Sequence, residues 1–219
     1  KKAKSELGIE INITHRQYAL TYGMMLGIRV AVGNQAELDV EHGPKARRDK
    51  AGNVLTGSSQ MTMDDFMRVN KMVFPPEGSS SAAGGYHTPP HRLNKPFKFK
   101  DYSPVVFRKV RERFGIDGAE YMLSLCGNFN FIEFISNSKS GQFFFYSADG
   151  KYMIKTQSKA ESKFLRRIMP HYYRYILSNP NTLITRFYGM HRVKMHHLDS
   201  EMHFVIMGSV FYTDKEIHR

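Results

Sequence analysis

Residues 142–168, which read QFFFYSADGKYMIKTQSKAESKFLRRI, decide the fold of this chain. Two apolar runs are separated by Asp149-Gly150, a pair that strongly favours a two-residue hairpin. Ser158 and Glu161 then form the S-x-x-E pattern that caps the beginning of a helix. The stretch therefore predicts two antiparallel strands followed directly by a helix.

Lys155 ends the second apolar run, at residues 151–155. By itself, a lysine at such a place is most often a solvated edge residue, and Glu161 can simply cap the next helix. Before the hairpin, a strand-like segment at 131–135 precedes the polar run 136–141. That run predicts a loop whose backbone N–H groups can approach phosphate oxygens closely. One glycine in a hairpin is more often only a turn, so the loop alone does not identify a phosphate site.

Two further strand-like segments, 182–193 and 202–207, follow the helix, which we expect Pro170 to end or kink. The order is then strand, glycine-containing loop, strand, turn, strand with a lysine, helix with an acidic residue, and two strands. This order is typical of the small lobe of a protein kinase, where a third-strand lysine contacts the phosphates of ATP. We therefore expect an α+β fold with an antiparallel sheet and packed helices.

The preceding part of the chain indicates helices. Apolar residues on both faces of 18–32 predict a helix buried on more than one side, and its Gly23 and Gly27 favour close packing. A second helix is expected over 61–74. A strand or extended arm at 97–100 and a helix at 104–114 are expected to follow.

Two polar segments, 34–59 and 77–92, are rich in residues that favour loops. We therefore divide the chain into an N-terminal helical region, 1–129, and a small lobe, 130–219, cut at its hinge. The chain starts without methionine, and we expect it to be a piece of a longer protein.

The chain of 219 residues has 32 Lys and Arg against 20 Asp and Glu, a net charge of +12. Residues 92–113 hold eight basic and two acidic residues, and residues 155–174 hold six basic and one acidic residue. Such concentrated charge attracts nucleic acid, anionic membranes or phosphorylated ligands, and charge alone does not separate these partners. A solvated helix face is the ordinary explanation of a basic run.

Other ligand classes find less support. The single cysteine, Cys126, excludes an internal disulfide and a cysteine-rich zinc site. Histidines such as His191 and His203 show no recognised ligand spacing, so no metal site is predicted. The uncharged run between Arg16 and Arg29 is too short to span a bilayer.

Several blocks of the sequence resemble the phosphatidylinositol phosphate kinases, most closely the type I phosphatidylinositol 4-phosphate 5-kinases. They include LGIR (26–29), residues 61–79, FKFKDYSPVVFR (97–108), YMLSLC (121–126), KYMIKT (151–156), FLRRIMPHYY (164–173) and residues 181–190. Only the inserts around 34–59 and 79–92 fall outside the resemblance.

The resemblance implies that 136–141 is the loop over the ATP phosphates, although Lys139 stands where relatives usually carry a glycine. It implies that Lys155 is the catalytic, nucleotide-binding lysine, and it places Glu161 at an acidic position of the following helix. The implied ATP-binding residues are Ser138, Lys139, Ser140, Gly141, Lys155, Glu161, and Met207, Gly208, Ser209 and Val210 at the hinge.

The resemblance also implies phosphoryl transfer from Mg-ATP to the 5-hydroxyl of phosphatidylinositol 4-phosphate, which makes phosphatidylinositol 4,5-bisphosphate. The Mg²⁺ ligands of the family lie in a second lobe, so we expect the 219-residue chain alone to be inactive. A homodimer and a cytoplasmic location at the inner face of the plasma membrane are implied as well. The candidate residues facing the anionic membrane are Lys95, Lys98, Lys100, Arg108, Lys109 and Arg111.

Two other classes remain open, a noncatalytic basic module that binds membranes or nucleic acid, and a scaffold or pseudokinase. Basic and aromatic residues at 97–102 and 172–175 are compatible with nucleic-acid binding. No RNA-binding, zinc-finger or helix-turn-helix signature accompanies them, so we expect no nucleic-acid partner. Lys155 argues against a scaffold.

Overall fold

The computed structural model describes residues 8–41, 61–80, 86–127, 131–134, 142–198, 200–210 and 212–213. Its eight strands form one antiparallel sheet in the order β1-β4-β5-β6-β8-β7-β3-β2. The strands are β1 (Ile9–Glu10), β2 (Val69–Phe74), β3 (Phe97–Tyr102), β4 (Ile132–Phe134), β5 (Phe144–Tyr146), β6 (Tyr152–Gln157), β7 (Phe187–Met195) and β8 (Ser200–Gly208). The predicted α+β fold with an antiparallel sheet is confirmed.

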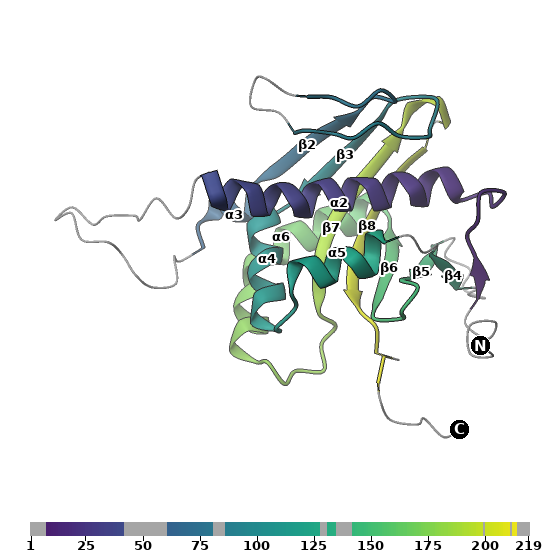
Figure 1. Cartoon of the computed structure of the whole chain (residues 1–219). Coiled ribbons are helices and arrows are strands. Elements are labelled where there is room, and N and C mark those ends of the chain that lie inside the picture. Colours follow the sequence, from purple (N-terminus) through teal and green to yellow (C-terminus); the bar gives the residue numbers. More distant parts are fainter. Residues whose placement is uncertain are drawn as a thin grey trace.

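Helices lie on both sides of the sheet (Figure 1). They are α2 (Tyr18–Glu41), α3 (Met63–Met67), α4 (Pro104–Arg113), α5 (Gly118–Cys126) and α6 (Lys159–Ser178), with the short 3-10 helix η1 (His196–Leu198). The long helix α2 runs across one face together with α5, and α6 lies behind the sheet in this view. We call these the α2 side and the α6 side.

The α2 side is a closed aromatic and aliphatic core. Met24 and Ile28 of α2 are fully buried in the same cluster as Phe97 and Phe99 of β3. A side chain at Gly27 would overlap the Phe99 ring, so this helix approaches the sheet as closely as its backbone allows. The predicted close packing at the glycines is confirmed, and the surface that α2 meets there is the sheet.

Residues 61–74 do not form the single helix expected from their periodicity. Only α3 is helical, capped by Thr62 and Asp65, whereas Val69–Phe74 is strand β2. All six residues of β2 align with β3, from Val69 opposite Tyr102 to Phe74 opposite Phe97. The prediction was wrong because pairing with a distant strand outweighed the local helical pattern.

Two other boundaries differ from the prediction. Helix α2 continues to Glu41, so residues 34–41 are not part of a loop; the rest of the predicted loop 34–59 lies outside the described residues. Helix α6 continues through Pro170 and therefore does not end there; it stops at Ser178, just before Asn179-Pro180.

The predicted division of the chain between 129 and 130 does not coincide with a break in the sheet. Strands β1, β2 and β3 come from the first part, and they continue the sheet formed by β4 to β8. The assignment of separate roles to the two parts stays a prediction.

Candidate functional site

Lys155 projects from β6 toward the α6 side of the sheet. Neighbouring strand residues alternate, and Tyr152 and Ile154 belong to the core under α2. Met153 packs instead with the cluster that contains Leu165 of α6. Lys155, two residues after Met153, therefore faces the same side as α6.

Phe144 forms the immediate neighbour of this lysine. It is the register partner of Lys155 in the β5–β6 pair, and the Lys155 Nζ lies 6.0 Å from the centre of the Phe144 ring. An ammonium group over an aromatic face is held by the ring quadrupole without losing its charge. Phe144 was not predictable from the sequence, because only the strand register brings it to Lys155.

Glu161 is held by hydrogen bonds at the start of α6. The Ser158 backbone N–H donates to its carboxylate at 2.7 Å, and the Glu161 N–H donates to the Ser158 Oγ at 3.1 Å. The predicted capping box is confirmed. The Gln142 amide also donates to both carboxylate oxygens, at 3.1 and 2.8 Å. The Ser158 backbone, with help from Gln142 and the charge of Lys155, holds the pKa of Glu161 below its ordinary value.

Lys155 and Glu161 are on the same side of the sheet but do not form an ion pair in the described part of the chain. The carboxylate of Glu161 is instead occupied by the helix cap and by Gln142. Gln142 is the first described residue after the predicted phosphate loop, since Ser138, Lys139, Ser140 and Gly141 lie outside the described residues. Glu161 thus anchors the chain beside that loop.

The predicted hinge residues extend from the end of β8. Met207 is buried opposite Met153, whereas Val210 is 75% exposed. The Ser209 N–H donates to the Lys151 carbonyl at 2.9 Å, which ties the hinge to the start of β6.

A cavity of about 390 Å³ borders Gly208, Ser209 and Val210, but Lys155 and Glu161 do not line it. Gly208 pairs with Tyr152, three residues before Lys155, so the two positions are about 10 Å apart along the strands. The predicted site residues that the structure describes therefore form two separate groups. Lys155 and Glu161 lie toward one end of β6, and residues 207–210 lie at the other end.

One of the candidate membrane residues is not at the surface. Arg111 is only 6% exposed, its guanidinium donates to the Tyr188 carbonyl at 2.7 Å, and it lies 4.8 Å from the Tyr121 ring. Its assignment to a membrane face was wrong, because a count of charges does not show which side of helix α4 faces the core.

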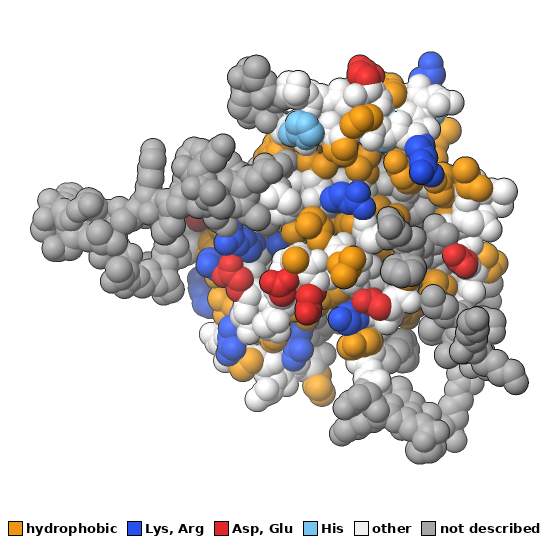
Figure 2. Space-filling model, viewed as in Figure 1, with side chains coloured by type: hydrophobic (Ala, Val, Ile, Leu, Met, Phe, Trp, Pro, Cys, Tyr) orange, Lys and Arg blue, Asp and Glu red, His pale blue; other side chains and the backbone are white. Residues whose placement is uncertain are grey.

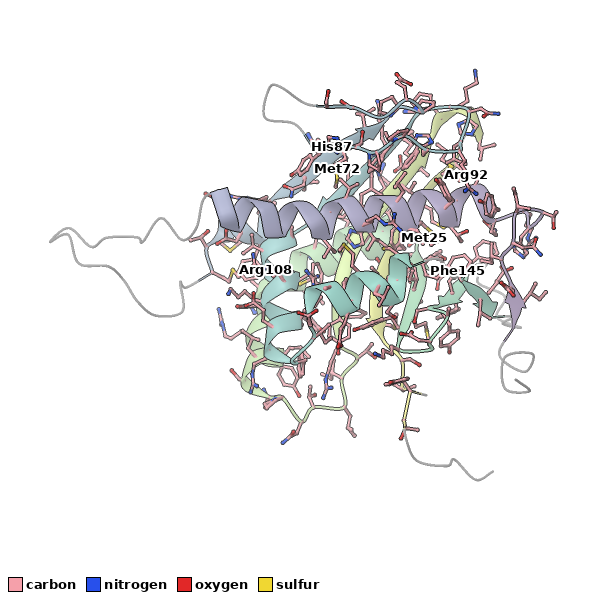
Figure 3. All side chains as sticks on the ribbon, viewed as in Figure 1. Met25, Met72, His87, Arg92, Arg108 and Phe145 are labelled. Carbon is pink, nitrogen blue, oxygen red and sulfur yellow. The ribbon has the colours of Figure 1, made fainter. Side chains whose placement is uncertain are left out.

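The other candidates occupy different places. Arg108 and Lys109 on α4 both pair with Glu112, at 3.0 and 2.7 Å, and Arg108 lies at the opposite end of the molecule from Phe145 of β5 (Figure 3). Lys95 and Lys98 are exposed, and Lys100 is half-buried.

Lys98 and Lys100 belong to a row of cations that crosses three strands. Lys71 of β2 is the register partner of Lys100, which in turn pairs with Arg192 of β7, and Lys98 pairs with Lys194. We call these five residues the cation face. Strand alternation puts all of them on the α6 side, since their neighbours Phe97, Phe99, Met72 and Val193 are buried under α2.

The electrostatics of the cation face confirm that its members influence one another. Burial, followed by the charges of Arg192 and Lys71, holds the pKa of Lys100 below its ordinary value. Among the described residues, Glu201 pairs with two of these cations, at 3.2 Å from Arg192 and 3.5 Å from Lys194. Like charges directly opposite in a sheet are destabilising, so this arrangement needs a reason other than stability.

Sequence reasoning missed Lys71, Arg192 and Lys194. The period-2 pattern places Arg192 and Lys194 on one side of their own strand, but only the pairing of β7 with β3 brings them to Lys98 and Lys100. On the α2 side, by contrast, acidic and basic side chains are interspersed (Figure 2).

In the segments that the structure describes, no three His, Cys, Asp or Glu side chains gather in a way that would hold a metal ion. The helices of the same segments are too short or too polar to cross a bilayer.

Comparison with known proteins gives one consistent result. Residues 125–219 match the phosphatidylinositol-4-phosphate 5-kinase family. The chain is 40% identical to phosphatidylinositol 4-phosphate 5-kinase 4 of Arabidopsis thaliana over 222 residues, which covers 100% of this chain and 25% of that protein. It is 37% identical to phosphatidylinositol 4-phosphate 5-kinase its3 of Schizosaccharomyces pombe, over 97% of this chain and 25% of the relative. The chain thus spans about a quarter of the length of these relatives, and the resemblance inferred from the sequence blocks is confirmed.

Proposed function

Because residues 125–219 match the phosphatidylinositol-4-phosphate 5-kinase family, we propose that this chain forms the ATP-binding small lobe and the N-terminal region of a lipid kinase. The reaction is transfer of the γ-phosphoryl group of ATP to the 5-hydroxyl of phosphatidylinositol 4-phosphate. The observation that carries the proposal is the position of Lys155, which faces the α6 side from the third strand of the β4–β5–β6 meander.

Lys155 is the residue that holds the ATP phosphates in this proposal. Its ammonium rests over Phe144 and has no carboxylate at ion-pair distance in the described residues, so it can meet phosphate oxygens directly. A cation placed there stabilises negative charge on the phosphoryl group during transfer, which is the main contribution of the protein in this class of reaction.

The segment 207–210 contributes the other end of the nucleotide site. Buried Met207 offers an apolar surface for a base, and the backbone that follows it offers hydrogen-bonding groups. Its separation from Lys155, about 10 Å along the sheet, is on the scale of a nucleotide with its base at one end and its phosphates at the other. Magnesium would neutralise the phosphates when bound.

Membrane attachment is the second part of the proposal. The cation face presents Lys71, Lys98, Lys100 and Lys194 on the same side of the sheet as Lys155, with Arg192, whose side chain is only 14% exposed, between them. Each basic residue near an anionic lipid surface adds about 1 kcal/mol of attraction, which salt screens. We therefore propose that the cation face binds the anionic inner leaflet of the plasma membrane, and that the protein is a homodimer formed through the region 1–129.

Nucleotide binding tests the first part directly. The chain is expected to bind a fluorescent ATP analogue, and Lys155→Ala is expected to weaken binding about tenfold or more. Lys109→Ala is the matched control, since Lys109 is an exposed lysine of α4 that pairs with Glu112 and does not line the cavity at the hinge. Equal loss in both variants would contradict the assignment of Lys155.

Liposome flotation tests the second part. Vesicles that contain phosphatidylserine and phosphatidylinositol 4-phosphate are expected to bind the chain in a salt-sensitive manner, whereas neutral phosphatidylcholine vesicles are not. Binding that ignores both lipid charge and salt would contradict the electrostatic proposal. Salt-sensitive binding to single-stranded RNA without binding to these vesicles would favour the nucleic-acid alternative.

A further inference from the structure

A pocket of about 610 Å³ lies apart from the ATP-binding region, between α3 and the outer surface of α6. Neither Lys155 nor Glu161 nor the hinge lines it. Its volume is in the range of pockets that bury a ligand or several side chains. The pocket therefore has to be explained separately from nucleotide binding.

The apolar part of the pocket is open to solvent at its rim. Phe66 is 8% exposed, whereas Met63, Met67 and Phe164 are each more than half exposed. Large apolar side chains grouped at the surface mark interaction sites, and methionine side chains adapt readily to different partners. An unpaired apolar surface of this kind is stabilised when another molecule covers it.

The polar part of the pocket is cationic on both walls. Arg68 follows α3 on one wall, and Lys163, Arg166 and Arg167 stand on α6 on the other. No Asp or Glu lines this pocket. The Nε of Arg166 is also buried without a hydrogen-bond partner. The occupant therefore has to carry negative charge as well as apolar surface.

Neighbouring parts of this chain do not meet that requirement. Residues 42–60, which precede Met61 directly, contain four Lys and Arg residues and one Asp. Residues 1–7 contain three lysines and one glutamate. Both segments carry a net positive charge, so the four cations disfavour them as occupants of the pocket.

Two kinds of partner carry both properties, an acidic peptide and an anionic lipid. A phospholipid has its charge at one end of a long apolar chain, which requires cations at one end of an apolar channel. Here both walls contribute cations as well as apolar residues, Arg68 with Met67 and Val69 on one wall, and Lys163, Arg166 and Arg167 with Phe164 on the other. This intermixed pattern complements a peptide in which acidic and bulky apolar side chains alternate.

We propose that the pocket between α3 and α6 is a docking site for an acidic segment of a partner protein. One or two bulky apolar side chains of that segment enter the pocket against Phe66, Met67 and Phe164. Flanking carboxylate or phosphorylated side chains pair with Arg68 and with the three cations of α6. The site does not depend on ATP or on lipid phosphorylation, so it goes beyond the function proposed above.

Fluorescence anisotropy with the labelled peptide GEDFEDFEG and the 219-residue chain tests this site. Saturable binding is expected, and Arg167→Glu is expected to weaken it about tenfold, because it replaces an attraction by a repulsion. Arg174→Glu is the matched control, since Arg174 is exposed on the same helix but does not line the pocket. Phe164→Ser is expected to weaken binding by a similar factor, whereas Leu183→Ser, at a fully exposed position away from the pocket, is not.

Two further peptides and one lipid arm complete the test. GEDSEDSEG, which keeps the charge, and GKKFKKFKG, which keeps the aromatic rings, are both expected to bind at least about tenfold more weakly. Absence of saturable binding, equal binding of GEDSEDSEG, or equal loss in Arg174→Glu would overturn the proposal. So would an Arg167→Glu variant that loses binding to phosphatidylserine vesicles while it keeps the peptide. Far-UV circular dichroism of each variant establishes that it is folded.

Discussion

The α2 side and the α6 side of the sheet share the same strands but differ in how completely helices cover them. On the α2 side, Phe97, Phe99 and Phe204 are fully buried under a 24-residue helix. On the α6 side, helices cover only part of the strands, and Lys155 and the cation face stand on the remainder. The α2 side therefore stabilises the fold, whereas the α6 side leaves some strand positions accessible to ligands.

The largest expected effect comes from the α2 side. Phe99→Ala is expected to lower the free energy of unfolding by about 3–5 kcal/mol, because it removes a fully buried ring that contacts Phe74, His191 and Phe204. Phe164→Ala on the α6 side, where the ring is half exposed, is expected to cost less than about 1 kcal/mol. Urea unfolding measures both, and equal losses would remove the distinction between the two sides.

A smaller effect is expected within helix α4. Arg111→Ala is expected to cost about 2–3 kcal/mol, since it leaves the buried Tyr188 carbonyl without its charged donor and removes packing on Tyr121. Lys109→Ala, which breaks an exposed pair with Glu112, is expected to cost at most about 0.5 kcal/mol. Thermal unfolding of the two variants would show whether adjacent basic residues of one charged run have such different roles.

A substitution that removes a charge from the cation face is expected to raise stability rather than lower it. Lys100→Gln is expected to raise the free energy of unfolding slightly, by about 0.5 kcal/mol, because it relieves repulsion with Lys71 and Arg192. The same substitution is expected to weaken binding to phosphatidylserine vesicles. Loss of stability together with unchanged vesicle binding would mean that the cation face has a structural role only.

The smallest expected effect is the pH dependence of stability that arises from His203, the register partner of Arg192 in the cation face. Burial lowers the pKa of His203 below its ordinary 6.5, although Glu201, 3.3 Å away, opposes the shift. Near pH 6.5 the unfolded chain therefore binds more protons than the folded chain. The contribution of neutral His203 to folding stability is present above pH 6.5 and is lost as the pH falls. Urea unfolding at about pH 5.5 and about pH 7.5 should show lower stability at the acidic value. His203→Gln should reduce this difference, and an unchanged difference would assign the pH dependence to other groups.

Local signals explain which parts of the fold were predictable. The hairpin at Asp149-Gly150 and the cap formed by Ser158 and Glu161 depend on residues within a few positions of each other, and both are present in the structure. Strand β2 was not predictable in this way, because its residues fit a helical period equally well until β3 pairs with them.

The same distinction between local and long-range signals applies to the residues of the candidate site. Lys155 and Glu161 were found from motifs around them, and the structure sets them on one side of the sheet. Phe144 and Gln142 were not, since their roles follow from the β5–β6 register and from a hydrogen bond across it. Arg111 was misplaced because its burial depends on where α4 packs against β7 and α5.

The sequence by itself determined the order of elements around Lys155, the cap at Glu161 and the family resemblance, because turn, cap and strand preferences act over a few residues. The tertiary structure decided which charges lie together. Lys71, Lys100 and Arg192 are far apart along the chain, and they form one row only because hydrogen bonds between β2, β3 and β7 set a register that no local pattern specifies.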